Sequence, residues 1–333
     1  MKWFKFYLVS FVCVLGLSAC APAARVVTKS GSSIVSLNRY VTGVSVSGTC
    51  RAQIYDNAKR SRVVLSGMSV KAANRVRVSV GRDTVYIGGN EPKAGKIKVY
   101  VRHLRAVTAN DRAQLTLHTR RSGHFDLTIR RSASVNVIGA PTVPSLVIEG
   151  DASFSHHGFY LRKFVHRGRG DVHITGVRGR AVDVAAYGPG SVNLEGAFTP
   201  INIVHRGSGN LTLTGIKGGN ISMCSQSTGR LSLNGVRLKA VSMHLYGGGH
   251  YQLTGYMSKL TLYMHDSVVV SARGLKVYSA YLRTSGNAVL RIFTLRRIFA
   301  RASDASRIEY YGHPTYKYIE ALDRAAVLPM SKD

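Results

Sequence analysis

The sequence predicts an all-β protein built as a parallel β-solenoid, a stack of similar coils of about 20 residues each. A heptad of the form Gly-x-apolar-x-apolar-x-Gly recurs as GDVHITG, GSVNLEG, GNLTLTG, GRLSLNG and GHYQLTG. Its first glycines are Gly170, Gly190, Gly209, Gly229 and Gly249. Apolar and polar residues alternate through most of the chain, and no amphipathic helix pattern exceeds a turn or two. One tryptophan and 34 glycines in 333 residues are also typical of a turn-rich β protein rather than a helical bundle.

The N-terminus has the layout of a bacterial secretion signal. Lys2 and Lys5 precede a nearly unbroken apolar stretch over residues 6–17, and the small residues Leu-Ser-Ala-Cys close it at Cys20. This ending resembles the lipobox, so we predict that residues 1–19 are a lipoprotein signal peptide and that Cys20 is lipidated. A signal without lipid is the alternative. The apolar stretch falls short of the ~20 residues that span a bilayer.

Acyl chains on Cys20 would anchor the protein to a membrane. Ala21 follows, and by resemblance to lipoprotein sorting this favours a bacterial outer membrane lipoprotein, on the periplasmic or the cell-surface face. Residues 20–37 are rich in Ala, Ser, Thr and basic residues without periodicity, which predicts a lipidated N-terminus and flexible tether.

Between residues 38 and 328 we expect one β-solenoid. Residues 38–169 alternate like strands without a clean period and are expected to form irregular coils and a cap. Residues 170–293 hold the regular coils, residues 294–328 are expected to form a C-terminal cap, and residues 329–333 a tail. A separate N-terminal β domain is the alternative for the irregular part. The irregular section and the C-terminal cap are expected to prevent end-to-end stacking.

Each regular coil has a second strand about ten residues after the first. The pattern repeats as VDV, INI, ISM, VSM and LTL, beginning at Val182, Ile201, Ile221, Val241 and Leu260. Period-two alternation directs the apolar residues of these strands inward and the polar residues outward, so that like residues stack in successive coils.

The wider pattern resembles the head GIN domain family of auto-transporter adhesins, which also occur as bacterial envelope lipoproteins. The resemblance covers residues 40–328 and is carried by residues 41–48 (VTGVSVSG), 76–101, 104–109 and the ending 305–314 (ASRIEYYGHP) with its Y-x-G-x-P turn. It implies a right-handed parallel β-helix and no catalytic residue. Only Gly207-Ser208-Gly209 keeps the family's Gly-Ser-Gly corner, so no ligand is carried over.

The charge of the chain points to anionic partners. Lys and Arg number 46 against 16 Asp and Glu, a formal net charge of +30. Arginines are densest before and within the early coils, and the candidate anion-binding residues are Arg120, Arg121, Arg130, Arg131, Arg162, Lys163, Arg167 and Arg169. Such a stripe could hold lipopolysaccharide phosphates or other anionic glycans. Nucleic acid fits the charge equally well, but export makes it an unexpected physiological partner. General basic character without a dedicated site is the alternative.

Aligned second strands predict an aromatic and basic patch in two outward columns. The candidate ligand-binding residues are His244, Tyr246, Tyr263, His265, Tyr281 and Arg283. Tyrosines on a rigid face can bind sugar rings, and arginine can pair with phosphate or carboxylate. Stabilisation of the sheet by cross-strand contacts is the alternative and is favoured by the pattern.

Catalysis, metals and cofactors are not expected. Parallel β-solenoids also carry polysaccharide lyases and hydrolases, which need paired carboxylates or acidic calcium ligands. The regular coils supply only Asp171, Asp183, Glu195 and Asp266. His244 with His265, and the pair His156-His157, lack acidic or cysteine partners at metal-ligand spacing.

Two cysteines remain in the exported part, Cys50 and Cys224. Disulfides are possible in that compartment, but two buried thiols are the commoner outcome for cysteines outside a motif.

The expected function is that of a non-catalytic, lipid-anchored envelope protein. Its rigid basic solenoid would serve adhesion, or bind anionic glycans, lipopolysaccharide or partner proteins. A carbohydrate-active enzyme on the same fold and a structural envelope scaffold are the alternatives.

Overall fold

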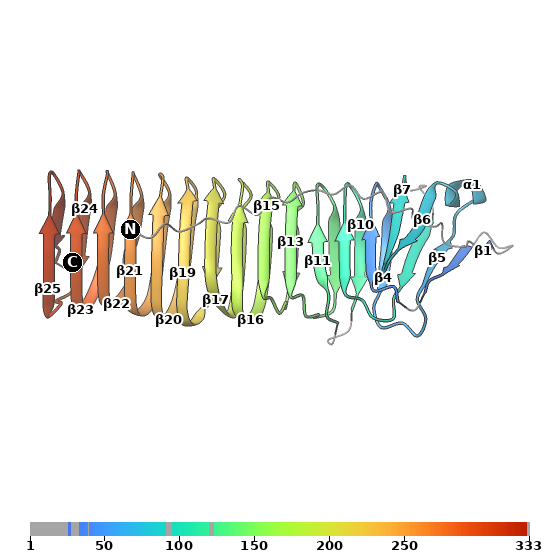
Figure 1. Cartoon of the computed structure of the whole chain (residues 1–333), viewed down its shortest axis with the longest axis horizontal. Coiled ribbons are helices and arrows are strands. Elements are labelled where there is room, and N and C mark those ends of the chain that lie inside the picture. The colour runs from blue at the N-terminus through green and yellow to red at the C-terminus, as the bar shows by residue number, and fades with distance from the viewer. Residues whose placement is uncertain (1–25, 28–32, 39, 91–94, 120–122, 332–333) are drawn as a thin grey trace.

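The computed structural model describes residues 26–27, 33–38, 40–90, 95–119 and 123–331. These form one elongated stack of β-coils with about 11 turns, and the coils lie side by side from one end of the molecule to the other (Figure 1). The expected signal peptide, the lipidation site Cys20 and most of the expected tether lie outside the described residues. Within the described residues, no helix is long and apolar enough to cross a membrane.

The first strand of each coil contributes to one side of the stack, called here the first-strand face. Its strands are β4 (Arg51–Tyr55), β10 (Gln114–His118), β12 (Ser134–Ile138), β14 (Phe154–His157), β18 (Leu211–Thr214), β24 (Arg307–Tyr311), β26 (Ala326–Pro329) and the first parts of β16 (Val172–Tyr187), β17 (Val192–Gly207), β20 (Arg230–Tyr246), β21 (His250–Met264), β22 (Val269–Thr284) and β23 (Val289–Ala302).

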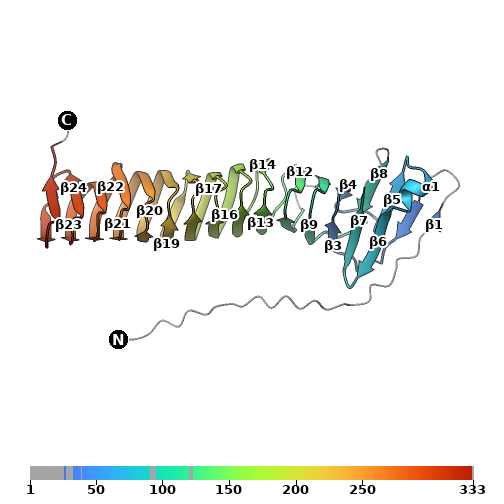
Figure 2. The ribbon, with the colours of Figure 1, turned by 90° about the horizontal axis from the view of Figure 1, so that it is seen from above.

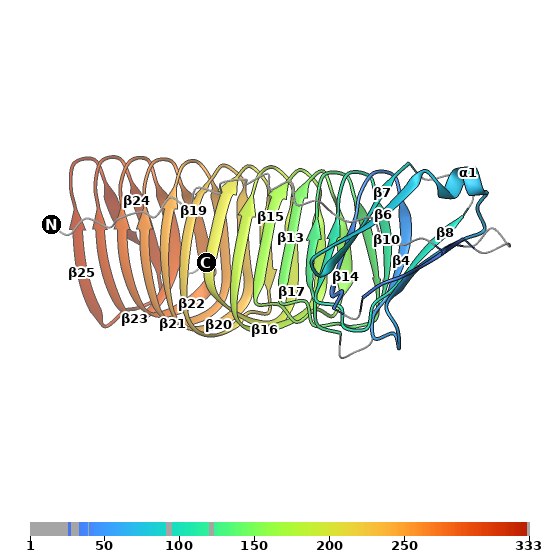
Figure 3. The same cartoon turned by 45° about the vertical axis from the view of Figure 1, so that its right-hand side comes forward.

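The second strand of each coil forms the second-strand face. It consists of β9 (Ala106–Ala109), β11 (Asp126–Ile129), β13 (Ser145–Gly150), β15 (Lys163–Gly168), β19 (Lys217–Ser227), β25 (Tyr316–Ala321) and the second parts of β16, β17 and β20 to β23. Neighbouring strands on this face pair in parallel, for example Val184 with Ile203 and Ile203 with Met223. The repeat therefore folds as predicted, into stacked parallel coils (Figure 3).

The long strands bend where they pass from one face to the next, along a third side of the coil. Gly196 and Gly255 lie at these bends with φ of 154° and 124°. A Cβ added at either glycine would lie 2.2 Å from a carbonyl oxygen of the preceding coil, that of Val177 or Val236. Glycine is therefore required there by both backbone conformation and close approach.

The N-terminal part mixes antiparallel and parallel strands (Figure 2). Its elements are β1 (Val26–Val27), β2 (Ser33–Ser36), β3 (Gly43–Val46), β5 (Arg62–Ser66), α1 (Val70–Ala73), β6 (Val76–Gly81), β7 (Thr84–Gly89) and β8 (Lys96–Tyr100). One sheet runs β1-β2-β5-β8-β4-β10-β12, antiparallel up to β8 and parallel from there. This sheet is continuous with the coils through β4, β10 and β12. β1 and β2 belong to the range expected to be a tether, and β2 is paired along its whole length with β5.

Apolar side chains from all faces meet in one core that runs through the coils. Val184, Ile203 and Met223 point inward as the alternation predicts. Ile201 does not: it is 38% exposed, and Pro200 takes the inward place beside Val182. The strand shifts register at this point, and the sequence pattern alone does not reveal such a shift.

The stacked strands extend through the residues expected to form a C-terminal cap. Residues 294–328 continue the stack, because β25 pairs in parallel with β23 and β26 pairs in parallel with β24. The last coil is therefore an edge of the solenoid. Lys317 occupies the column that holds the buried Ile298 in the coil before it, and Pro329 lies in the edge strand β26. An inward charge and an edge proline are two devices that oppose pairing with another chain.

Candidate functional site

The third side of the solenoid carries a row of exposed basic side chains, called here the basic ridge. Its members are Arg178, Arg180, Lys217, Arg237, Lys239, Lys259, Lys276, Arg296 and Arg297. They lie on the segments that join the first to the second strand in six of the seven coils from β16 to β23, and the segment within β17 has none. These joining segments contain no Asp or Glu.

The stacking places one pair of ridge cations on paired positions of neighbouring coils, and others two coils apart. Lys217 pairs in register with Arg237. Tyr256 and then Lys276 occupy the same column in the next two coils. Adjacent strands lie ~4.8 Å apart, and at about that distance two like charges repel by about 1 kcal/mol in water. Within the described part of the chain, no ridge side chain forms an ion pair with a carboxylate. An anion lying on the ridge would relieve this repulsion.

Some ridge cations contact aromatic rings instead. The Lys259 ammonium lies 5.0 Å from the centroid of the Tyr281 ring, and the Arg297 guanidinium lies 5.4 Å from that of Tyr316. Arg296 donates a hydrogen bond to the Tyr278 hydroxyl, which raises the pKa of its guanidinium above the ordinary value. These contacts orient the cations without neutralising them.

Toward the N-terminus the ridge meets a cavity of about 750 Å³. A line of single bridges from His124 through Thr142 and Tyr160 to Arg178 connects the two. The cavity walls carry Arg102, His103 and Arg105 as well as His124. The two carboxylates at the cavity bind the backbone around it. Asp56 accepts hydrogen bonds from the backbone N–H groups of Asn57 and Leu104. Asp126 accepts one from the backbone N–H of Ser145.

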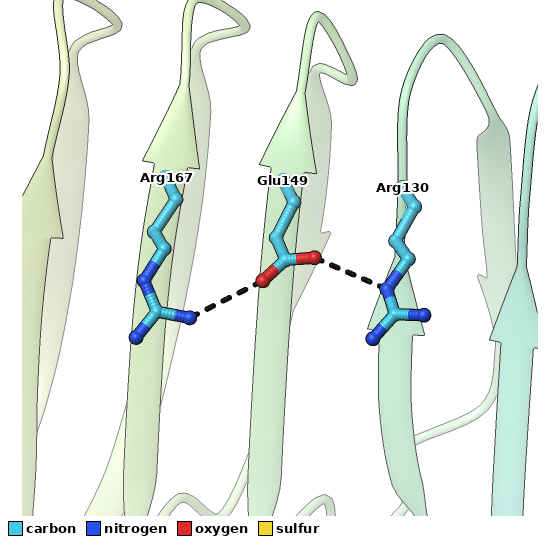
Figure 4. Close-up of polar contacts among 3 residues, drawn as sticks. All are labelled: Arg130, Glu149 and Arg167. Atoms are coloured by element: carbon cyan, nitrogen blue, oxygen red, sulfur yellow. Dashed lines mark hydrogen bonds and ion pairs between the residues drawn. The ribbon is translucent and has the colours of Figure 1, made fainter. Parts of the chain in front are cut away.

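The arginines expected to bind anions do not form a single stripe. Arg130 and Arg167 both pair with Glu149, at 3.1 Å and 3.2 Å, as Figure 4 shows. Arg131 forms an ion pair with Asp111. Three of the eight candidates are therefore already paired.

The remaining five candidates are scattered or lie outside the described residues. Lys163 begins β15 and Arg162 directly precedes it, whereas Arg169 follows the other end of that strand. Arg120 and Arg121 lie outside the described residues. The three described candidates therefore lie apart: Arg162 and Lys163 at the start of β15, and Arg169 just after its end.

The predicted ligand-binding columns form in the predicted register. His244, Tyr263 and Arg283 follow one another on successive coils. The His244 and Tyr263 rings stack with centroids 4.6 Å apart, and the Tyr246 and His265 rings stack at 5.0 Å. Each ring thus covers one face of its neighbour, which leaves less ring surface for a ligand and provides the sheet-stabilising contacts of the alternative.

A second aromatic column lies beside these residues and borders a groove of about 350 Å³. In this column Tyr281 is followed, on the next two coils, by Phe299 and Tyr318. Neither of these two residues was among the predicted ligand-binding residues. The opposite wall holds Arg283, Arg301 and Glu320. The sequence pattern predicts only Tyr263, Tyr281 and Arg283 of this groove, because the residues after 293 are expected to form a cap.

The basic ridge was missed for a related reason. The alternating pattern that predicts the two strands of each coil does not extend to the segments between them. A signal was nonetheless present, because a lysine or arginine recurs between the two strands in six of the seven coils from Arg178 to Arg297.

Three of the four acidic residues of the regular coils accept hydrogen bonds within the fold. Asp171 accepts a hydrogen bond from the backbone N–H of Ser191 at 2.8 Å, and Asp183 accepts one from the Asn202 amide at 2.7 Å. Asp266 accepts one from the backbone N–H of Gly247. Asp183 lies on the second-strand face, whereas Glu195 ends the first part of β17 on the first-strand face.

Buried histidines lie inside the solenoid near one corner. His166 and His205 point inward two coils apart, and burial lowers the pKa of both imidazoles. His205 contacts the Gly209 carbonyl at 2.9 Å, and the Tyr251 hydroxyl donates to the Ser225 hydroxyl at 2.8 Å. These are contacts of a packed interior.

Metal ligation has no cluster to support it among the described residues. No group of three or more His, Cys, Asp or Glu side chains there could hold an ion. His156 packs against Phe159 with ring centroids 4.0 Å apart, and burial, with a smaller effect of His157, lowers its pKa to about 4. Neither Cys50 nor Cys224 forms a disulfide within the described residues. The buried Cys50 thiol donates to the Gly89 carbonyl at 3.3 Å, and Cys224 is half-buried.

Comparisons with known proteins place the chain in a family. The family model described as "Putative auto-transporter adhesin, head GIN domain" matches residues 40–218 and 202–314. No curated protein sequence matches the chain.

Solved structures that match this chain include two from bacteria of the genera Parabacteroides and Bacteroides. A putative lipid binding protein from Parabacteroides distasonis ATCC 8503 shares 11% identity, with 91% of this chain and 98% of that chain covered and a TM-score of 0.28. A putative adhesin from Bacteroides fragilis NCTC 9343 shares 12% identity, with 90% and 96% covered and a TM-score of 0.29. Because the family model spans most of the sequence, this chain belongs to the head GIN domain family of putative auto-transporter adhesins.

Proposed function

We propose that this protein is a non-catalytic, lipid-anchored envelope protein that binds acidic glycans, including lipopolysaccharide, along the basic ridge. The single observation that carries the proposal is a ridge of exposed cations from β16 to β23 whose joining segments contain no carboxylate. With coils ~4.8 Å apart, the seven coils of the ridge extend roughly 29 Å. A linear polyanion laid along this length contacts many cations at once, so that individually weak contacts add up.

The proposal is tested by measuring binding of the full chain to polygalacturonate and to lipopolysaccharide at increasing salt. The variant Lys217→Gln/Arg237→Gln/Lys276→Gln removes three ridge charges. If each exposed charge contributes about 0.5 kcal/mol, the triple variant binds roughly tenfold more weakly. Affinity of the unaltered chain should fall steeply as salt rises, because exposed charges are screened.

The matched control removes the same number of charges where they are already paired. Arg130→Gln/Arg131→Gln/Arg167→Gln lowers the net charge equally but leaves the ridge intact. Equal weakening by both triple variants would show that only net charge matters and would overturn the assignment to the ridge. Tighter binding to duplex DNA or to phosphatidylglycerol vesicles at the same salt would assign the ridge to another partner.

The proposed anchor has its own test. Cells expressing the full chain are labelled with radioactive palmitate, and label is expected on the protein but not on Cys20→Ser. Protease digestion on intact and permeabilised cells then determines the membrane face. Digestion on intact cells supports adhesion at the cell surface, and protection until permeabilisation supports binding to glycans inside the envelope.

A further inference from the structure

The groove between two outward columns of the last coils combines three kinds of chemical group. Tyr281, Phe299 and Tyr318 form one wall, and Arg283, Arg301 and Glu320 form the other. The register places each aromatic residue two positions before a charged residue on the same strand. A ligand in this groove therefore meets apolar ring surface on one side and charge on the other.

The rings along the groove differ in how much of their surface is free. Tyr281 and Phe299 stack with centroids 4.8 Å apart and an interplanar angle of 2°, so each covers the other. Phe299 and Tyr318 are 6.5 Å apart and tilted by 33°. Tyr318 is 60% exposed, against 36% for each of the other two. The ring face of Tyr318, in the last coil, is therefore the most accessible of the three.

The charged wall is positive on balance. Arg301 pairs with Glu320 at 3.5 Å, whereas Arg283 has no carboxylate partner among the described residues. A free guanidinium binds a carboxylate with two parallel hydrogen bonds. Glu320 retains an exposed carboxylate edge that can accept hydrogen bonds from hydroxyl groups.

The groove also adjoins the basic ridge. Lys259, Ser279 and Arg297 follow one another in register, and Lys259 and Arg297 belong to the ridge. Arg297 lies two residues before Phe299 on the same strand. A polymer lying along the ridge would therefore reach the groove at the C-terminal coils.

We propose that this groove binds a carboxylated sugar ring of an acidic glycan. The Tyr318 ring packs against the C–H face of one sugar, and Glu320 accepts hydrogen bonds from its hydroxyls. Arg283, two coils away in register, pairs with a carboxylate further along the glycan. The inference rests on the proposed function, because it identifies the acidic glycan of the ridge as a uronic-acid polymer rather than any polyanion.

The experiment compares short probes on the full chain by calorimetry. Trigalacturonate carries sugar rings and carboxylates, triglutamate carries carboxylates without rings, and galactotriose carries rings without charge. Trigalacturonate is expected to bind tightest. Tyr318→Ala and Tyr318→Leu should each weaken trigalacturonate roughly tenfold and leave triglutamate unchanged, and Arg283→Gln should weaken both acidic probes.

The matched control is Tyr86→Ala, which removes an exposed tyrosine from β7 at the other end of the molecule. It should change no affinity. Equal binding of trigalacturonate and triglutamate, or an unchanged trigalacturonate affinity in both Tyr318 variants, would overturn the inference. Tyr318→Leu retains an apolar side chain, so loss in both variants reports the ring and not a misfolded last coil.

The two proposals fail in different ways. If the ridge variant leaves polygalacturonate binding unchanged while Tyr318→Ala still weakens trigalacturonate, the groove stands and the ridge fails. If the ridge variant weakens the polymer but no short probe distinguishes Tyr318→Ala from the unaltered chain, the ridge stands and the groove fails.

Discussion

Three glycines in the coils allow the cost of close stacking to be separated from the cost of backbone conformation. Gly219 has neither a positive φ nor any atom within 4 Å of an added Cβ. Gly235 has φ of 62° but open space around it, and Gly255 combines φ of 124° with a Cβ position 2.2 Å from the Val236 carbonyl oxygen. Replacing each by alanine adds these effects one at a time.

The expected free energies follow from this geometry. Gly219→Ala should stabilise the fold by about 0.5 kcal/mol, because alanine restricts the unfolded chain. Gly235→Ala adds a left-handed strain of about 1–2 kcal/mol, which leaves a net loss of roughly 1 kcal/mol. Gly255→Ala also pushes a side chain into the preceding coil, and a loss of about 3 kcal/mol or more is expected.

Urea unfolding followed by circular dichroism measures these differences. Because each coil of a solenoid contacts only its neighbours, hydrogen exchange of the flanking coils serves as a local second readout. The reasoning is refuted if Gly255→Ala unfolds at the same urea concentration as Gly235→Ala, since the contact between coils would then have no energetic consequence.

Three further predictions concern the interior and the end of the stack. Burial lowers the pKa of His166 and His205 below the ordinary 6.5, so the unfolded chain takes up protons more readily. The free energy of unfolding is then largest above about pH 6.5 and falls as the pH is lowered, which urea titrations at pH 7.5 and 5.5 check; a flat profile would contradict it. Tyr251→Phe removes the hydrogen bond to Ser225 and should cost about 1–2 kcal/mol, measured by urea unfolding. Lys317→Ile removes the inward charge of the last coil and should produce concentration-dependent dimers or longer assemblies in analytical ultracentrifugation, whereas a strictly monomeric variant would show that Lys317 does not protect the edge.

Periodicity made the architecture predictable. The glycine heptads predicted the first strand of each regular coil, and the alternating triplets about ten residues later predicted the second. His244, Tyr263 and Arg283 lie in one column, as predicted. Where the period fades, before Gly170, the sequence alone did not reveal that antiparallel and parallel strands share one sheet. The pairing of β8 with both β4 and β5 joins segments whose proximity no local pattern encodes.

The candidate site was harder to predict because charge depends on neighbours in other coils. Arg130 and Arg167 look free in the sequence, yet Glu149 lies 19 and 18 residues away, which is one coil in each direction. Tyr318 and Phe299 were overlooked because the last strands carry no glycine heptad. In both cases the decisive contacts join residues of different coils, which lie about 18 to 20 residues apart in the sequence.

The stacking of similar coils has a consequence for how the proposed binding can change. A coil is a modular unit, and adding or removing one, such as residues 229–248, leaves the pairing rules of the others intact. Each insertion would extend the row of cations by one step and supply one more counterion-binding position. If the ridge binds a polymer as proposed, the length of polymer it contacts would change in whole coils, and duplication of a coil could lengthen it without a change in the existing contacts.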